Sequence, residues 1–502
     1  MKILNAQQAK AWDEFTIQQE PVSSIDLMER AAQKCAEWIL TKKLRNNHFT
    51  IFCGKGNNGG DGLAIARLLL KKGLRVTVYI LEFGKLGTAD FQTNLQRLHE
   101  LFFTDIHFIQ DKEHFPQLNT SNVIVDALFG NGINSPLTGL NAEVVTHINH
   151  SGCTIVSIDL PSGLFIDKSS IGNIVVEADH TLTFQCYKLG LLVAENAKYI
   201  GEVHVLDIGL HPHFLETQSS AYELIDERII KQIFKPRQRF THKGNFGHAA
   251  LITGSIGLMG AATLCAAACM RTGAGKLTCY VPQTGYEIMQ IAVPEAMAKI
   301  GGENFVSAID DDLQKFDAVG IGPGLGLYDK HENFLQKLFS SYHKPFVIDA
   351  DALNILSRHV YLLKNISHES VITPHSVEFD RLFGKTTNDF ARIELAKHRS
   401  QEYNIYIILK GHHSVIAAPD GKCYINNTGN AGMATGGSGD VLTGIITSLL
   451  AQGYKPVDAA ILGVYLHGLA GDYAAEKLSQ EAMVAGDIVE YLPKAFQTFY
   501  ER

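Results

Sequence analysis

The stretch GNAGMATGGSGDVLTG, residues 429–444, decides the fold around it, because its six glycines lead directly into an apolar run. Apolar residues in that run recur at the spacing of one helix face: Val441, Leu442, Ile445, Ile446, Leu449 and Leu450. Gly453 and Pro456 then supply a stop signal. The pattern predicts a glycine-rich loop that leads into a helix beginning close to Asp440.

Such a loop is suited to bind an anion. Gly436, Gly437 and Gly439 let the backbone adopt positive φ and approach a ligand closely. The first N–H groups of the helix have no partner within the helix, and the helix dipole adds partial positive charge. Phosphate is the anion that this arrangement favours. A Walker-type phosphate loop is excluded, because the chain contains no GxxxxGK(S/T).

Asp440 has two interpretations, because a carboxylate in an anion site competes with the anion for the same donors. It is either the N-cap of the helix or a general base that takes the proton of a hydroxyl attacking a phosphoryl group. The run TGGSGD followed by an apolar helix resembles the glycine-rich anion hole and catalytic aspartate of ribokinase-like small-molecule kinases.

Composition narrows the class of protein. At 502 residues the chain is long enough for two or three domains, and 46% hydrophobic with 19% charged residues is typical of a soluble enzyme. The formal net charge of −8 does not predict the basic surface that binds nucleic acid or an anionic membrane. Small molecules are therefore the expected ligands. Eight scattered cysteines without a CxxC pair predict a reducing cytoplasm. No apolar segment predicts secretion or membrane insertion.

The first half of the chain reads as alternating strands and helices. The spacing predicts helices over residues 5–18 and from Ser23 or Ser24 to about Leu44, with Ser23 and Asp26 as a capping box. The β-run FTIFC then leads through GKGNNGGDG, residues 54–62, into the helix LAIARLLLKKG. Further strands are predicted over residues 76–81, 105–110, 122–129 and 154–159. This order predicts a doubly wound parallel sheet with right-handed crossovers.

GKGNNG is also a formal GxGxxG, and Glu82 follows the next strand, where a dinucleotide fold places its ribose acid. An NAD-dependent dehydrogenase therefore stays an alternative. The polar side chains of residues 57–61 argue against it, since their oxygens suit a hard cation, a sugar or a phosphate. Asp126 and Asp159 end two further strands, and in a parallel sheet both face the ligand side. An aspartate that closes a strand is, taken alone, most often a cap or turn residue.

Three motifs in order, GxGNNGGDG, VDALFGNGINSPLTG and SIDLPSG, resemble the NAD(P)H-hydrate epimerase domain over most of residues 1–215. The resemblance implies interconversion of the R and S hydrates at C6 of the nicotinamide ring. It implies that the substrate is lined by Asn57, Asn58, Gly59, Gly60, Asp61, Gly130, Asn131, Gly132, Ile133, Asn134, Ser135 and Pro136. It implies a potassium ion held by Asn58, Asp126 and Ser162, with Asp159 as the substrate-binding acid or base.

From about Gly209 to Ile225 apolar residues no longer recur at the spacing of a helix or a strand. This predicts a boundary between two domains, residues 1–218 and 225–502. Beyond a short helix over residues 226–234, the segment HAALITGS predicts a buried strand. The run GAATLCAAACMRTGAG, residues 260–275, predicts a helix of small residues packed on the sheet. Four strand ends follow: FDAVGIGPGLG, PFVIDADALN, SVITPHSVEFDRL and NIYIILKGHHSVI.

Together with residues 429–440 these motifs resemble the ADP-dependent NAD(P)H-hydrate dehydratase, a ribokinase-like family, over about residues 225–502. The resemblance implies that the adenine nucleotide is contacted by Lys410, Gly411, His412, His413, Ser414 and Gly439. It implies that the S-hydrate is contacted by Ala262, Gly324, His375 and Asp440, with Asp440 as the catalytic base and Mg²⁺ on the phosphates. Taken alone, His375 is better explained as a capping or core histidine than as a ligand.

The sequence therefore predicts an α/β protein of two doubly wound domains, an N-terminal Rossmann-like epimerase and a C-terminal ribokinase-like dehydratase. Hydrated NADH or NADPH and ADP are the expected partners, and we expect a cytoplasmic homo-oligomer. Two alternatives stay open: a dehydrogenase fused to a sugar or vitamin kinase, and a non-catalytic nucleotide-binding protein.

Overall fold

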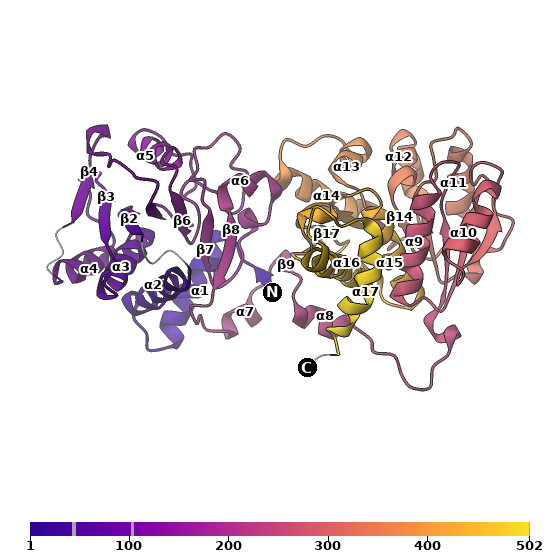
Figure 1. The fold of residues 1–502 in the computed structure, drawn as a ribbon, viewed down its shortest axis with the longest axis horizontal. Helices are drawn as coiled ribbons and strands as arrows, with labels where there is room; N and C mark the ends of the chain where they lie inside the picture. The colour runs from indigo at the N-terminus through magenta and orange to yellow at the C-terminus, as the bar shows by residue number, and fades with distance from the viewer. Residues whose placement is uncertain (43–46, 102–104, 501–502) are drawn as a thin grey trace. The chain divides into compact units, whose positions relative to one another are not determined.

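The computed structural model describes residues 1–42, 47–101 and 105–500, and the chain divides into two compact α/β units (Figure 1). The first unit consists of Lys2–Ser220 with Asn388–Phe390, and the second is made mainly of Ala221–Thr387 and the chain from Ala391 onward. Among the described residues, no helix is long and apolar enough to cross a membrane.

The sheet of the N-terminal unit runs in the order β4-β3-β2-β5-β6-β7-β8, and all its strands are parallel. The strands are β2 His48–Cys53, β3 Val76–Leu81, β4 Ile106–Ile109, β5 Asn122–Ala127, β6 Thr154–Ile158, β7 His180–Phe184 and β8 Glu202–Leu206. The further elements are β1 Lys2–Ile3, α1 Ala6–Gln19, α2 Ser24–Thr41, α3 Asn57–Lys71, α4 Ala89–His99, α5 Leu140–Asn149, α6 Ala197–Ile200 and α7 His213–Thr217. The prediction of a doubly wound parallel sheet is confirmed, and the strand order reverses between β2 and β5.

Side chains alternate between two cores on opposite faces of this sheet. Ile51 packs with α2 and α3, whereas its neighbour Phe52 packs with α5, as the period of two along a strand requires. The predicted helix from Ser23 or Ser24 ends at Thr41, and Leu44 lies outside the described residues. The Ser23 side chain caps α2 by accepting a hydrogen bond from the Asp26 N–H. The predicted capping box is not formed, because Asp26 Oδ2 accepts a hydrogen bond from the Ser23 hydroxyl and not from the Ser23 N–H.

The glycine-rich segment after β2 differs from the prediction, because α3 already begins at Asn57 instead of after Gly62. A Cβ added at Gly59 would overlap the Gly54 carbonyl, and one at Gly62 would lie 2.6 Å from Ala127 Cβ. These glycines therefore serve close packing of the first helical turns on the ends of β2 and β5, and tertiary contacts override their low helix propensity.

The sheet of the C-terminal unit includes, in order, β9-β18-β17-β16-β15-β14-β13-β10-β11-β12. Its strands are β9 Tyr222–Leu224, β10 His248–Ile252, β11 Lys276–Val281, β12 Met297–Ile300, β13 Ala318–Ile321, β14 Phe346–Ile348, β15 Val371–Ile372, β16 Tyr406–Leu409, β17 Val415–Ala417 and β18 Cys423–Ile425. Pairing is parallel from β12 to β16, and β17 is antiparallel to both its neighbours. Its strand order reverses between β10 and β13.

The helices of this unit are α8 Glu227–Ile233, α9 Met259–Thr272, α10 Tyr286–Ala292, α11 His331–Ser341, α12 Ala350–Arg358, α13 Ser376–Phe383, α14 Asp389–Tyr403, α15 Ser438–Ala451, α16 Pro456–Leu478 and α17 Ala485–Gln497. One large core joins the sheet to α9, α15, α16 and α17. The small-residue helix α9 lies against α15, where a Cβ added at Gly444 would overlap the Cys265 carbonyl. Small side chains thus allow the two backbones to approach closely and fix the position of α15.

Candidate functional sites

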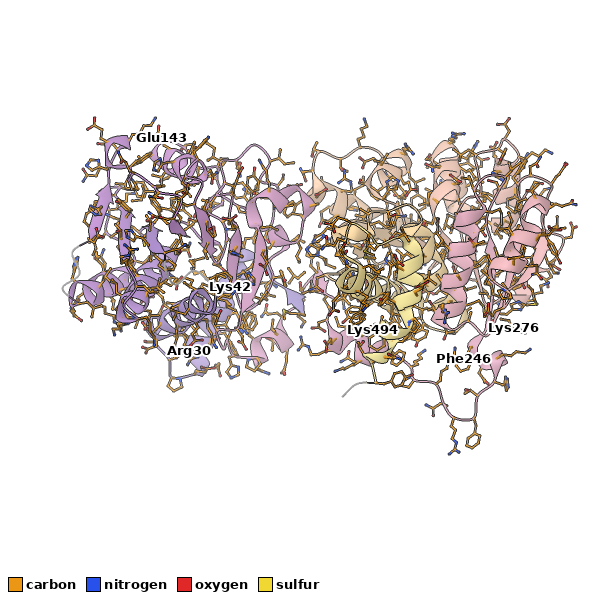
Figure 2. The ribbon with its side chains drawn as sticks, viewed as in Figure 1. Arg30, Lys42, Glu143, Phe246, Lys276 and Lys494 are labelled. Carbon is orange, nitrogen blue, oxygen red and sulfur yellow. The ribbon has the colours of Figure 1, made fainter. Side chains whose placement is uncertain are left out.

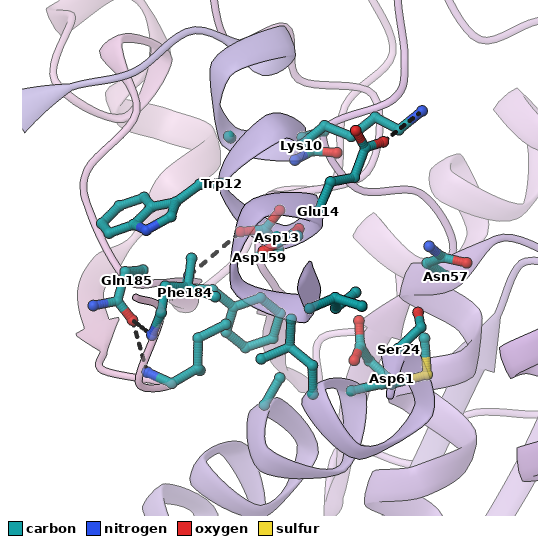
Figure 3. A pocket seen from close by; sticks show the side chains of 18 of the residues that line it. Lys10, Trp12, Asp13, Glu14, Ser24, Asn57, Asp61, Asp159, Phe184 and Gln185 are labelled. Carbon is teal, nitrogen blue, oxygen red and sulfur yellow. Dashed lines mark hydrogen bonds and ion pairs between the residues drawn. The ribbon is translucent and has the colours of Figure 1, made fainter. Parts of the chain in front are cut away.

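The N-terminal unit holds a cavity of about 280 Å³ at the carboxyl ends of its strands, between them and α1 and α2. Asp159 and Gln185, which follow β6 and β7, line it from the sheet side, and Trp12 and Asp13 of α1 line it from the other (Figure 3). Parallel sheets bind their ligands at this edge. Asn57 and Asp61 from the first turns of α3 also reach the cavity.

Two tight turns present the side chains of Asp159 and Gln185 to this cavity. Asp159 has a φ of 65°, and the Leu160 N–H donates across it to the Ile158 carbonyl at 2.8 Å. Gln185 has a φ of 64°, and the Cys186 N–H donates to the Phe184 carbonyl at 2.7 Å. Three-residue turns with positive φ are rare and strained, and such strain concentrates where a side chain must be aimed at a ligand.

Charged side chains meet in the cavity. The Lys188 ammonium, which is 3% exposed, donates to Asp159 Oδ1 at 2.7 Å and to Thr183 Oγ1 at 2.6 Å. Burial, and next the charge of Asp159, raise the pKa of Asp13 to about 7. The same two causes raise the pKa of Asp61 well above its ordinary value. The cavity therefore holds carboxyl groups that keep or exchange protons near neutral pH.

Asp126, Ser162 and Asn58 form a second, buried group beside this cavity. Asp126 has no exposed surface, and its carboxylate accepts from Ser162 Oγ at 2.6 Å, from the Ser162 N–H at 2.9 Å and from Ser157 Oγ at 2.8 Å. No cationic side chain of the described residues pairs with it, and burial raises its pKa although these hydrogen bonds oppose the shift. The side-chain oxygen and nitrogen of Asn58 are buried without any hydrogen-bond partner.

The structure brings together part of the predicted epimerase residues. Asn57, Asp61, Asn131 and Asp159 line the cavity. The others lie outside its lining: Asn58, Gly59, Gly60, Asp126, Gly130, Gly132, Ile133, Asn134, Ser135, Pro136 and Ser162. Gly130 is next to Asn58, since a Cβ added there would lie 3.7 Å from Asn58 Oδ1.

The C-terminal unit holds a larger cavity, of about 690 Å³, between the loop before α15, α16 and the end of β16. Six predicted residues line it: His375, Lys410, Gly411, His412, Ser414 and Gly439. His413 lies outside the lining and interacts with the Asn426 carbonyl at 3.3 Å. Ala262 and Gly324 are buried outside it, and Ala262 has no exposed surface. Asp440 is also outside the lining, although its neighbour Gly439 belongs to it. The contacts of these three residues with the substrate stay predictions.

The start of α15 corrects one interpretation of Asp440. Gly437, with a φ of 94°, occupies the N-cap position, and Asp440 is the third residue of the helix, so Asp440 is not the N-cap. Gly437 alone of the three predicted glycines has positive φ. Among the described residues none donates a hydrogen bond to the Asp440 carboxylate, although it stands at the positive end of a helix. Burial, and next the charge of Asp349, raise the pKa of Asp440 to about 7.

A buried charge network surrounds Asp440. Lys410 Nζ donates to Asp349 Oδ1 at 2.7 Å and lies 3.8 Å from Glu378 Oε2. Thr443 Oγ1, one turn beyond Asp440 on α15, donates to Asp349 Oδ2 at 2.9 Å. Burial alone lowers the pKa of Lys410, but Asp349 and Glu378 together raise it. Asp349 thus ties the end of β14 to α15 and to the cation that faces the cavity.

Two histidines at this cavity have structural partners. His375 is the N-cap of α13: its Nδ1 accepts from the Val377 N–H at 3.1 Å, and Glu378 completes a capping box. The capping interpretation of His375 is therefore correct, and the residue also faces the cavity. His467 Nε2 lies 2.9 Å from the Ser438 carbonyl, and burial lowers the pKa of His467 to about 4. A neutral His467 donates to this carbonyl and holds the first turn of α15.

Five residues of the two sites were not predicted from the sequence: Asp13, Lys188, Asp349, Glu378 and His467. Asp349 follows the strand in the motif PFVIDADALN. The same strand-end position that indicated Asp126 and Asp159 could therefore have indicated Asp349 as a site residue. Glu82, the ribose acid of the dehydrogenase alternative, is instead paired with Lys55 and accepts from the Gly84 N–H at 2.7 Å.

Two family models match, one described as YjeF-related protein N-terminus over residues 24–190 and one as NAD(P)H-hydrate dehydratase over residues 249–494. The bifunctional NAD(P)H-hydrate repair enzyme Nnr of Moorella thermoacetica is 37% identical over 518 residues, which cover 100% of this chain and 98% of that protein. The Escherichia coli protein of the same name is 33% identical, with 93% and 89% covered. The crystal structure of the ADP/ATP-dependent NAD(P)H-hydrate dehydratase from Bacillus subtilis with ATP and Mg²⁺ is 31% identical, has a TM-score of 0.50 and covers 55% of this chain and 98% of that one.

Proposed function

Because this chain belongs to the family of bifunctional NAD(P)H-hydrate repair enzymes, with an epimerase and a dehydratase in one chain, we propose that its two cavities divide that work. The N-terminal cavity exchanges the R and S hydrates of NADH or NADPH. The C-terminal cavity binds ADP and removes water from the S-hydrate. Since the dehydratase accepts one epimer, the epimerase makes the other epimer usable.

The observation that carries the dehydratase assignment is the unpartnered Asp440 carboxylate at the N-terminus of α15, beside the larger cavity. Hydroxide is a poor leaving group, so the oxygen of the C6 hydroxyl first bonds to the terminal phosphorus of ADP. The bond from that phosphorus to the bridging oxygen breaks, and AMP leaves. Asp440 takes the hydroxyl proton, and the N–H groups at the start of α15 stabilise the charge that develops on the phosphoryl group. Departure of phosphate from C6, with loss of a proton from the neighbouring carbon, then restores the nicotinamide double bond.

The nucleotide lies in the 690 Å³ cavity in this proposal, with Lys410, Gly411, His412, Ser414 and Gly439 as its contacts. Mg²⁺ would be held by the phosphate oxygens of the nucleotide, because oxygen ligands suit this ion and the Asp440 carboxylate serves as the base. When bound, Mg²⁺ neutralises phosphate charge. The Bacillus subtilis relative was crystallised with ATP and Mg²⁺, which supports both partners.

A pair of matched variants tests this division. Asp440→Asn removes the base but leaves Gly436–Gly439 and the start of α15 in place, so nucleotide binding should survive while dehydration falls roughly 10²–10⁴-fold. Epimerisation should be unchanged. Asp159→Asn should lose epimerisation and keep dehydration. Dehydration is measured with pure S-hydrate and ADP by the absorbance of reduced nicotinamide. Epimerisation is measured with R-hydrate by chromatography. Loss of both activities in either variant would contradict two independent sites.

In the N-terminal cavity we assign proton exchange to Asp159 and Asp13. When the C6–OH bond breaks, the hydroxyl must gain a proton to leave as water, and the water that returns from the opposite face must lose one. No electrons are transferred overall. A pKa of about 7 lets Asp13 both give and take a proton at neutral pH, and Lys188 holds Asp159 in position at 2.7 Å.

We further propose that K⁺ binds at Asn58, Asp126 and Ser162. The fit rests on the orphaned Asn58 oxygen and on a buried Asp126 without a cationic partner. The ion would supply the positive charge that this carboxylate lacks, and hard oxygen donors suit it. Its role is to fix these loops beside the substrate.

Asp126→Asn tests the ion site, because the amide keeps the side-chain shape but removes its only charge. Epimerase activity should fall and the remainder should no longer respond to added K⁺. Asp126→Ala should behave in the same way. A variant that keeps the wild-type potassium dependence would place the ion elsewhere. Ser157→Ala is the control, since Ser157 donates to Asp126 at 2.8 Å but is not among the proposed ligands.

We also propose a cytoplasmic location, supported by eight cysteines that are all buried and free. That the chain forms a homo-oligomer stays a prediction.

A further inference from the structure

Two histidines and a glutamate converge on one face of the N-terminal sheet, away from the cavity. His180 opens β7 and is the register partner of Glu202, which opens β8. His204 follows Glu202 by two residues, so its side chain points to the same face as that of Glu202. The three side chains offer ligand atoms that all lie within 4.8 Å of one another.

The distances between these atoms are close to those around a single tetrahedral ion. His204 Nε2 lies 3.4 Å from His180 Nδ1. The two oxygens of Glu202 each approach one imidazole: Oε2 lies 3.5 Å from His180 Nδ1, and Oε1 lies 3.6 Å from His204 Nε2. One oxygen of Glu202 lies within 4.8 Å of both nitrogens. Bonds of about 2.0–2.1 Å at tetrahedral angles place ligand atoms about 3.3–3.4 Å apart. Two imidazole nitrogens at 3.4 Å also make a poor hydrogen bond, so their lone pairs are better used by a shared cation.

The surroundings hold the two imidazoles in place. The Trp38 ring on α2 contacts both, with centroids 5.1 Å from His180 and 4.7 Å from His204. The His204 side chain is 17% exposed, whereas that of Glu202 is 63% exposed, which leaves a water-accessible side to the cluster. Lys42, which is labelled in Figure 2, directly follows α2. Its Nζ lies 5.0 Å from the Trp38 ring centroid, and its charge acts on His204. This ammonium opposes a bound cation.

We propose that His180, Glu202 and His204 bind one divalent transition-metal ion, Zn²⁺ above all, with water as a fourth ligand. Two histidines and a carboxylate are a ligand set that proteins use for Zn²⁺. The ion joins the edge strand β8 to β7. His180 is the first residue of β7 and Phe184, which lines the cavity, is the last, so about 13 Å of strand separates the ion from the epimerase site.

Zinc binding to the full chain tests the site. Protein stripped with EDTA and dialysed is titrated with Zn²⁺ against a chromophoric chelator at pH 7.5. We expect one equivalent per chain that is lost in His180→Ala and in His204→Ala. Since Glu202 is exposed, Glu202→Gln should fold normally and still weaken binding. Co²⁺ in the wild-type site should give the intense visible absorption of a tetrahedral complex.

Three controls make the result decisive. Glu177→Gln removes an exposed carboxylate of the same unit and should change nothing. Lys42→Gln should tighten binding, because it removes the opposing charge. Epimerase activity should persist in Glu202→Gln, and Zn²⁺ should raise the melting temperature of the wild type but not of this variant. If the wild type and Glu202→Gln bind zinc equally, or if neither binds it, the proposal is wrong.

Discussion

At the scale of single residues, the carboxylates that carry the proposed chemistry are held at a cost to stability. Asp440 has an ordinary pKa near 3.8 and a pKa of about 7 in the fold. The folded chain therefore keeps this proton to higher pH than the unfolded chain does. The contribution of Asp440 to stability is thus lost as pH rises from about 4 to about 7, and above pH 7 the folded protein bears the full penalty.

Asp440→Asn should therefore stabilise the C-terminal unit while it lowers the rate of dehydration. The melting temperature of the variant should exceed that of the wild type, with a larger difference at pH 8 than at pH 5. Differential scanning calorimetry at both values measures this. Asp329→Asn, which changes an exposed aspartate, should show no such difference. A variant that melts below the wild type at pH 8 would show that the Asp440 charge is satisfied in the fold.

A site residue could be predicted from the sequence where the residues next to it along the chain mark a strand end or a glycine-rich loop. Asp159 and Asp440 follow a strand or a glycine loop, and both were predicted from that position. Asp13 and Lys188 were missed, because Asp13 lies on α1 and Lys188 beyond β7, and nothing local marks either as a partner of Asp159. Contacts between residues distant in sequence appear only in the fold.

At the scale of elements, the close approach of α9 and α15 determines where the catalytic carboxylate lies. Gly444→Ala would force the new methyl group into the Cys265 carbonyl and push α15 away, at about 1–3 kcal/mol of stability. Because Asp440 lies one turn earlier on the same helix, we expect dehydration to fall more than stability alone explains. Calorimetry and dehydration assays with the variant measure both effects.

The matched control is Gly486→Ala on α17, where nothing lies within 4 Å of an added Cβ. Alanine there should be neutral or stabilising, since glycine is the weaker helix former. Equal dehydration by Gly444→Ala and the wild type would show that α15 tolerates displacement.

Element boundaries were predictable where local signals and tertiary packing agree. The strand Val76–Leu81 was predicted with its observed bounds, because a β-branched run is flanked by polar residues. The start of α3 was predicted too late, because glycines usually break helices, and only the neighbouring Gly54 and Ala127 show why this helix needs them. The antiparallel direction of β17 could not be predicted, because the apolar run around residues 415–417 does not distinguish an antiparallel strand from a parallel one.

At the scale of the whole molecule, each unit has its own sheet, cores and cavity, so we expect each to fold alone. Residues 1–220 should epimerise and residues 221–502 should dehydrate the S-hydrate. The second fragment should melt higher than one that starts at residue 225, because the shorter one lacks β9, the parallel partner of β18. Absence of cooperative melting in both longer fragments would contradict this division.

The burial of all eight cysteines has a practical consequence. Four thiols, Cys35, Cys53, Cys153 and Cys186, belong to the N-terminal unit, and four, Cys265, Cys269, Cys279 and Cys423, to the C-terminal unit. A buried thiol reacts with an alkylating reagent only when its surroundings open, so labelling times report local unfolding. The labelling rates of the two sets of thiols therefore report local opening of the two units separately. Mass spectrometry of peptides labelled over time would measure these rates.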